Sequence, residues 1–165
     1  MGYTHYWTRP TELDAKKFTE FANIVRTILD HLPEQTRSAG GYYGEAPLAL
    51  AGPEGTGPAQ VDEQSVAFNG AGQFAHETFA LERVFTPWHR RQAPGPDGRW
   101  GAFCKTDRKP YDLAVCAALI ALRRVFGPEV TVQTDGQEGD WQPALEFYRQ
   151  RFGEEVGFSD LVSDK

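Results

Sequence analysis

The chain has 165 residues, of which 40% are hydrophobic and 13% aromatic, and its formal net charge is −6 at pH 7. This length and apolar content suit one globular domain with a full core, so we expect residues 1–165 to form a single domain. The longest apolar run covers ten residues, 113–122, about half of a membrane span, and no basic-then-apolar leader opens the chain. We therefore expect a cytoplasmic protein with no membrane partner.

The charges are distributed unevenly along the chain. Residues 83–124 carry nine Lys or Arg and three Asp or Glu, which gives this segment +6 and the remainder −12. Proteins that bind along a nucleic-acid backbone have an extended basic face. The acidic remainder of this chain argues against such a face, so no long nucleic acid is expected as a partner. A compact basic region on an acidic body suits a small anion better. The alternative is that these cations pair with the acidic surface.

The first third of the chain predicts a strand followed by a helix. Residues 3–8 alternate and are rich in aromatic residues and threonine, which favours a strand and places His5 among aromatic neighbours. Thr11 is expected to cap the next helix, with Asp14 completing a variant capping box. Apolar residues at helical spacing then predict an amphipathic helix over 12–32.

The middle of the chain predicts a long connector and a hairpin. Residues 37–60 are rich in glycine and proline and contain Tyr43, which is long for a connector in one domain. An antiparallel hairpin is expected over residues 64–85, with its turn at 70–72. Asn69, at the end of the first strand, is either a turn residue or an amide that faces a ligand.

The last third predicts strand, helix, strand and helix. The expected strands cover residues 102–106 and 130–134, and the helix between them, 110–126, is apolar on nearly every side. Such a βαβ unit normally has parallel strands. With a final helix over 141–152, the predicted fold is α+β: a mixed sheet with one parallel βαβ unit, the antiparallel hairpin and three helices.

The start of the buried helix is the candidate ligand site. Lys105, Arg108 and Lys109 surround the expected first turn at Pro110, where backbone N–H groups lack helical partners. Cations beside such groups bind phosphate or carboxylate through charge-assisted hydrogen bonds. If strands 102–106 and 130–134 are parallel, the loops after both strands emerge at one edge of the sheet, where ligands of α/β proteins collect.

Further residues are candidates for the same ligand site. Asp135 could accept a hydrogen bond from a ribose hydroxyl or an exocyclic amine. It could instead pair with Lys105 or Arg108 of the basic loop (residues 105–109) and only tie two loops together. Nucleotide fingerprints of the Walker or Gly-x-Gly-x-x-Gly type do not occur in this segment. The remaining candidates are a threonine beside the cations, aromatic side chains that could stack a ring, and one amide: Thr106, Tyr43, Tyr111, Trp141 and Asn69.

His5 is the candidate acid–base residue, because histidine titrates near neutral pH. The alternative is a strand histidine that is hydrogen-bonded inside an aromatic cluster. The sequence has no Cys-x-x-Cys, His-x-Glu-x-x-His or paired-histidine spacing, so neither a metal site nor a cofactor is expected. Cys104 and Cys116 are interpreted as reduced core residues.

Five motifs resemble a family of small, uncharacterised proteins of bacteriophages and bacteria. They are Met-Gly-Tyr-Thr-His-Tyr-Trp at the start, Phe-Asn-Gly at 68–70, Phe-Cys-Lys-Thr at 103–106, Arg-Lys-Pro-Tyr-Asp at 108–112 and Asp-Gly…Asp-Trp at 135–141. The resemblance covers most of the chain but brings no activity and no catalytic residue. It implies a phage setting, in which an accessory or counter-defence role, such as sequestering a nucleotide signal, is an expectation by analogy.

Three functions follow from these patterns. The first is binding, without turnover, of a small anionic and phosphate-bearing, nucleotide-like ligand at the basic loop. The second is hydrolysis of such a ligand, for example as a phosphodiesterase, with His5 as acid or base. The third is a protein–protein inhibitor or structural module, with the Trp88–Arg91 loop in the interface. The sequence does not decide whether the protein is an enzyme, and a homo-oligomer is compatible with it.

Overall fold

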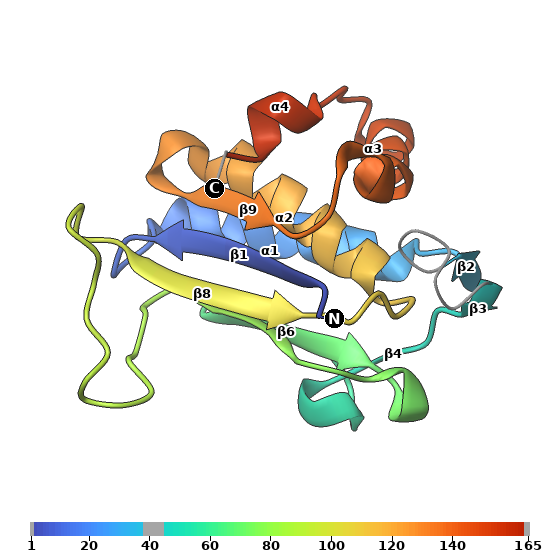
Figure 1. The fold of residues 1–165 in the computed structure, drawn as a ribbon, viewed down its shortest axis with the longest axis horizontal. Helices are drawn as coiled ribbons and strands as arrows, with labels where there is room; N and C mark the ends of the chain where they lie inside the picture. Colours follow the sequence, from blue (N-terminus) through green and yellow to red (C-terminus); the bar gives the residue numbers. More distant parts are fainter. Residues whose placement is uncertain (1, 38–44, 164–165) are drawn as a thin grey trace.

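The N-terminal strand is the middle of the main sheet. In the computed structural model, which describes residues 2–37 and 45–163, β1 (Thr4–Arg9) lies between β8 (Trp100–Lys105) and β9 (Thr131–Thr134), as Figure 1 shows. Both pairings are antiparallel, and His5 lies opposite Cys104 on one side and Thr134 on the other. The middle strand therefore has hydrogen-bonded neighbours along both edges.

The predicted parallel pair is wrong, because β1 separates the two strands that were expected to be adjacent. Since β8 and β9 each run antiparallel to β1, both end near the N-terminal end of β1. The loops after the two strands therefore emerge at the same edge of the sheet, although the strands do not pair. Strand order escaped prediction because the sequence carries no signal for which edges meet.

A smaller set of strands contains the predicted hairpin. Strands β6 (Ser65–Gly70) and β7 (Phe79–Glu82) pair antiparallel, with Val66 opposite Leu81 and Phe68 opposite Phe79. A 3-10 turn at residues 72–74 (η3) lies within the connection, which is longer than the turn expected at 70–72. The strands outside the main sheet are β2 (Gln35–Arg37), β3 (Glu45–Pro47), β4 (Leu50–Ala51), β5 (Gln60–Val61), β6 (Ser65–Gly70) and β7 (Phe79–Glu82).

The described residues form four α-helices, and three of them match predicted helices with shifted starts. They are α1 (Ala15–Asp30), α2 (Asp112–Phe126), α3 (Glu138–Phe152) and the short α4 (Phe158–Leu161). Asp14, and not Thr11, caps α1, because its side chain accepts from the backbone N–H of Lys17 at 3.0 Å. The carbonyl of Thr11 instead accepts from the backbone N–H of Phe85 at 2.8 Å.

The core lies where the main sheet meets α1 and α2. Trp7 of β1, Phe18 and Phe21 of α1, and nearly all of α2 are buried in one cluster. Helix α2 was predicted to be buried on nearly every side, and it is: only its N-terminal and C-terminal turns contain side chains that water partly reaches. Within residues 2–37 and 45–163, no helix is long and apolar enough to cross a membrane.

Arg9 ends β1 inside the protein, with only 1% of its surface exposed. Its guanidinium donates to the carbonyl oxygens of Pro10 at 3.0 Å, of Arg83 at 2.8 Å and of Glu82. Burial lowers the pKa of Arg9 to about 10, so the group still carries its charge at neutral pH. One side chain therefore connects the main sheet to the strand β7 and the residues after it.

Replacing Arg9 by lysine should destabilise the fold. An ammonium has one nitrogen and cannot reach these separate carbonyls, so buried acceptors lose their donors, and we expect a loss of about 2–4 kcal/mol in the free energy of unfolding. Urea denaturation measures it. The matched control is Arg149→Lys on the exposed face of α3, which should leave the urea midpoint nearly unchanged. Equal effects of the two substitutions would contradict a structural role for Arg9.

Candidate functional site

The centre of the site is His5, whose ring is fully buried in the middle of the main sheet. Nε2 lies 2.6 Å from Oδ1 of Asp112, and Nδ1 lies 2.8 Å from Oγ1 of Thr134. The rings of Tyr3 and Trp141 pack edge-on against the imidazole, each at 5.1 Å between centroids. Both ring nitrogens are therefore hydrogen-bonded. These surroundings match the alternative interpretation of His5 as a strand histidine hydrogen-bonded inside an aromatic cluster.

Asp112 is the first residue of α2 and is almost completely buried. The hydroxyl of Thr106 donates to Oδ1 at 2.6 Å, and the thiol of Cys116, one turn further along α2, donates to Oδ2 at 3.5 Å. With Nε2 of His5 as the third donor, the carboxylate is surrounded by donors. The position of Asp112 in the first turn of α2 adds a favourable interaction between the helix dipole and this carboxylate.

The hydrogen bonds at Thr134 assign the proton on His5. Oγ1 of Thr134 accepts from the backbone N–H of Gly136 at 2.9 Å and from Nε1 of Trp141 at 3.3 Å. These two donors use both acceptor positions of the hydroxyl, so its own hydrogen is left to donate to Nδ1 of His5. Nε2 then carries the ring hydrogen and donates it to Asp112. We assign His5 as the neutral Nε2–H form on this network.

The two cysteines are thiols and not nucleophiles. Both are free and buried. Burial raises the pKa of Cys116 well above its usual value, and the charge of the neighbouring Asp112 raises it further. Burial also raises the pKa of Cys104, with Glu77 and Asp112 adding to the effect. A protonated thiol is a poor nucleophile, which argues against covalent catalysis by Cys116.

The cations of the basic loop are used within the protein. Nζ of Lys109 donates to the backbone carbonyls of Gln73 at 3.0 Å and Ala75 at 3.1 Å. Arg108 lies over the ring of Tyr3 at 4.2 Å and pairs with Asp140 at 3.3 Å. Lys109 and Arg108 therefore already interact with groups of the protein. This arrangement resembles the alternative interpretation, in which the cations pair within the protein and not with a ligand.

The expected anion site at the start of α2 also loses backbone donors. The helix begins at Asp112 and not at Pro110, because residues 106–112 form successive tight turns. The N–H of Lys109 bonds to the carbonyl of Thr106 at 3.1 Å, and that of Asp112 bonds to the carbonyl of Lys109 at 2.9 Å. Donors that were predicted to face a ligand are satisfied inside the loop.

The other candidates fall into separate places. Asn69 is buried and holds the hairpin connection, where its side chain bonds to Gly70 and His76. The hydroxyl of the buried Tyr111 donates to the carbonyl of Glu77 at 2.6 Å. Asp135 is exposed and accepts from the N–H of Thr4 at 3.1 Å. The side chain of Lys105 is half-buried, and Tyr43 lies outside the described residues. The structure brings His5, Thr106 and Trp141 together and places the other described candidates outside this cluster.

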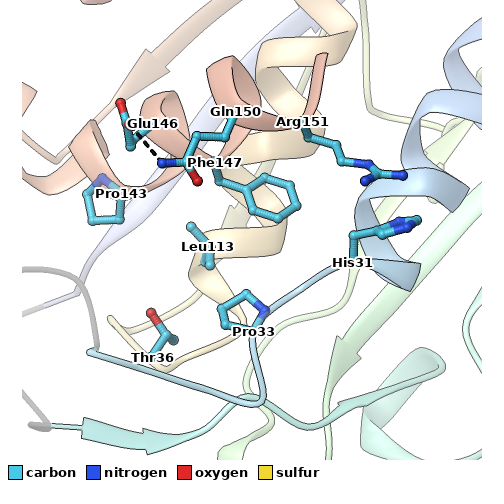
Figure 2. Close-up of a pocket in the computed structure, with 9 residues that line it drawn as sticks. All are labelled: His31, Pro33, Thr36, Leu113, Pro143, Glu146, Phe147, Gln150 and Arg151. Carbon is cyan, nitrogen blue, oxygen red and sulfur yellow. Dashed lines mark hydrogen bonds between the residues drawn. The ribbon is translucent and has the colours of Figure 1, made fainter. Parts of the chain in front are cut away.

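A groove that the sequence did not reveal lies between the end of α1, the start of α2 and α3. Figure 2 shows Leu113 at its floor, Phe147 beside it, and the side chains of Arg151 and His31 at one end. The cavity measures about 570 Å³. Its lining residues are His31, Pro33, Thr36, Leu113, Pro143, Glu146, Phe147, Gln150 and Arg151.

A narrow cleft continues from this groove toward the buried cluster. It has a volume of about 10 Å³ and shares Thr36, Leu113 and Pro143 with the groove. Asp112 and Cys116 line it, together with other residues of α2 and α3. His5 does not line it, so Asp112 and Cys116 are the members of the buried cluster that face the groove. No periodicity could have predicted this, because the groove joins segments more than a hundred residues apart.

No family model, curated protein or solved structure matches the chain. The resemblance to small phage and bacterial proteins therefore stays a prediction.

Both thiols should resist modification in the folded protein. Their raised pKa values keep them protonated at mildly alkaline pH, where an exposed cysteine reacts readily, and burial keeps the reagent out. We expect Ellman's reagent to label them at least about a hundredfold more slowly in buffer than in urea, where both become accessible. Rapid labelling of either thiol in buffer would contradict the assigned environment.

Replacing Thr134 by valine should destabilise the protein by about 2 kcal/mol, because two buried donors and one ring nitrogen lose their partner. Chemical denaturation gives the change in the free energy of unfolding. Thr131→Val is the matched control on the same strand, since the one partner of its hydroxyl among the described residues is Thr8, at 2.6 Å, in a half-buried position. It should lower stability by less than about 1 kcal/mol. If the control has the larger effect, the network around His5 is not a stabilising unit.

Proposed function

We propose that the protein binds a small anionic, ring-bearing ligand, nucleotide-like in its chemistry, in the groove between α1, α2 and α3. The observation that carries this proposal is the combination of an apolar floor with a cation at one end. A volume of about 570 Å³ lies within the range of small-molecule sites, roughly 300–1,000 Å³. The proposal keeps the ligand class expected from the sequence and moves the site away from the basic loop.

The charge of the groove favours an anion. Glu146 is already paired, since Arg149 approaches its carboxylate at 2.6 Å and the side chain of Gln150 donates to it at 3.0 Å. The side chain of Arg151 makes no hydrogen bond or ion pair with any residue in the described part of the chain. Its guanidinium is therefore the available charge in the groove, and it matches a phosphate or carboxylate in a bidentate geometry.

His31 adds a second polar group at the same end. Nδ1 lies 2.8 Å from the carbonyl of Thr27, and because a carbonyl only accepts, Nδ1 must carry a hydrogen. Nε2 is then the nitrogen left for a ligand, as an acceptor when the ring is neutral and as a donor when it is protonated. His31 and Arg151 together can hold an ionised group at the rim of the groove.

The apolar part of the groove suits a planar ring. Phe147 is half-buried on α3, with Leu113 beside it, Pro143 on the same helix and Pro33 on the segment after α1 (Figure 2). Aromatic and apolar side chains bind a base by stacking and by removing it from water. A ring against Phe147 and an anionic group at Arg151 make a nucleotide-like ligand the best match.

Binding without turnover fits this arrangement better than acid–base catalysis by His5. The imidazole is fully buried, and both of its nitrogens are hydrogen-bonded within the protein. It cannot meet a substrate in the groove without breaking one of those bonds. Sequestration of a small signal by a cytoplasmic phage or bacterial protein is a role of this kind, and it rests on the resemblance of the motifs.

A protein–protein interface is the second candidate, and one observation favours it. Trp88 is 77% exposed in the loop between β7 and β8, far above what a large aromatic side chain usually shows. Exposed tryptophan and arginine side chains are common at the centres of interfaces. A partner that protects Trp88, with no small molecule bound in the groove, would favour this function.

Calorimetry with matched charge reversals tests the ligand site. The probes are mononucleotides, cyclic nucleotides and ADP-ribose, preceded by mass spectrometry of small molecules released from the purified protein by heat. Arg151→Glu should weaken binding of the best probe by more than about a hundredfold, equal to about 2.7 kcal/mol. Lys105→Glu in the basic loop is the control and should leave affinity unchanged.

The opposite pattern would relocate the site. If Lys105→Glu abolishes binding and Arg151→Glu does not, the ligand binds at the basic loop. If no probe binds and none is released, the interface function takes precedence. Product in excess of the protein would show an enzyme.

A further inference from the structure

We propose that His5, Asp112 and Cys116 bind a divalent transition-metal ion of the zinc type at the inner end of the narrow cleft. Their ligand atoms are an imidazole nitrogen, a carboxylate oxygen and a thiol sulfur, which all lie within 4.8 Å of one another. Nitrogen and sulfur ligands with one carboxylate are a donor set that zinc accepts. The proposal does not depend on the nature of the ligand in the groove.

The spacing of the cluster fits a tetrahedral ion. Sγ of Cys116 lies 3.5 Å from Nε2 of His5 and 3.5 Å from Oδ2 of Asp112. With ordinary metal–sulfur, metal–nitrogen and metal–oxygen lengths, the corresponding edges of a tetrahedral zinc site are about 3.6 Å. The third edge joins Nε2 of His5 to Oδ2 of Asp112, because the hydroxyl of Thr106 holds Oδ1. Binding of the ion therefore replaces the 2.6 Å hydrogen bond between Nε2 and Oδ1.

The surroundings have the hydrogen bonds that orient metal ligands. Thr134 contacts Nδ1 of His5 at 2.8 Å, so the opposite nitrogen points at the cluster. Thr106 fixes one oxygen of Asp112 at 2.6 Å. Partners of this kind hold ligands in place, and their loss typically lowers metal affinity by about 10–100-fold. The two ligands Asp112 and Cys116 are also one turn apart on the same helix, which makes their spacing rigid.

Uptake of the ion balances in protons and charge. Cys116 releases its thiol proton to solvent, and His5 stays neutral but moves its hydrogen from Nε2 to Nδ1. The ion's charge of +2 is then matched by one carboxylate and one thiolate, whereas the metal-free cluster contains one buried negative charge. The hydrogen on Nδ1 needs Thr134 as acceptor, so Trp141 must give up its long bond of 3.3 Å to that hydroxyl.

The cleft leaves a fourth position open toward the groove. Asp112 and Cys116 line it, and its volume of about 10 Å³ is roughly that of one water probe. Three protein ligands with one open position is the arrangement of metal ions that bind a water or a substrate group, whereas structural zinc sites have four protein ligands. A metal at this point would lie where the inner end of a ligand in the groove could reach it.

Cobalt(II) titration of the folded, metal-stripped full chain tests the site. A thiolate–cobalt charge-transfer band in the near ultraviolet should appear and saturate at one equivalent, while the Nε1–H resonance of Trp141 shifts. Zinc should displace the cobalt. Absence of a saturable charge-transfer band in the wild-type protein would overturn the proposal without any variant.

Matched cysteine variants then locate the ion. Cys116→Ser should abolish the charge-transfer band, and Cys104→Ser, which removes the other buried thiol, should leave it unchanged. Thr134→Val should keep the band and weaken cobalt affinity by about tenfold or more. A band that survives in a folded Cys116→Ser protein, or that disappears in a folded Cys104→Ser protein, would overturn the assignment. Circular dichroism establishes that each variant is folded, and Cys116→Ala replaces Cys116→Ser if the serine variant is not.

Discussion

The hydrogen bond between His5 and Asp112 joins the middle strand of the main sheet to the first turn of α2. It is 2.6 Å long and lies in the interior, where His5 is fully buried and Asp112 almost completely so. A buried carboxylate is stable only when donors surround it, and removing one partner of such a pair typically costs about 3–5 kcal/mol. Sheet and helix must therefore meet in the one arrangement that satisfies both groups.

The rest of the architecture follows from this constraint. Thr106, just after β8, bonds to Asp112, and Thr134, at the end of β9, bonds to His5. The ends of both outer strands thus converge on the same pair, which explains why β1 lies between them. Trp141 extends the network to α3, whose position against α2 in turn defines the groove. One polar network sets both the strand order and the place where a ligand can bind.

The density of cations along the chain does not show which cation is available to a ligand. The basic loop has the highest local density of cations, yet Lys109 binds two backbone carbonyls and Arg108 lies between the ring of Tyr3 and Asp140. Arg149 and Arg151 lie two residues apart near the end of α3. Of these two arginines, Arg149 has a carboxylate partner among the described residues and Arg151 has none. Availability of a charge is decided by its neighbours in space, and these cannot be counted along the chain.

Sequence periodicity by itself determined the α+β class, the approximate extents of α1, α2 and α3, and the pairing of β6 with β7, because each depends on residues close together in the chain. Residue chemistry also singled out His5 as an acid–base candidate and Thr106 and Trp141 as ligand-site candidates, and these three side chains lie in the same buried network. The tertiary structure alone decided the strand order and the buried cluster, since His5 lies 107 residues from Asp112 and 129 from Thr134. A strand carries the same backbone donors and acceptors along both edges, so only packing and the satisfaction of buried polar groups can choose its neighbours.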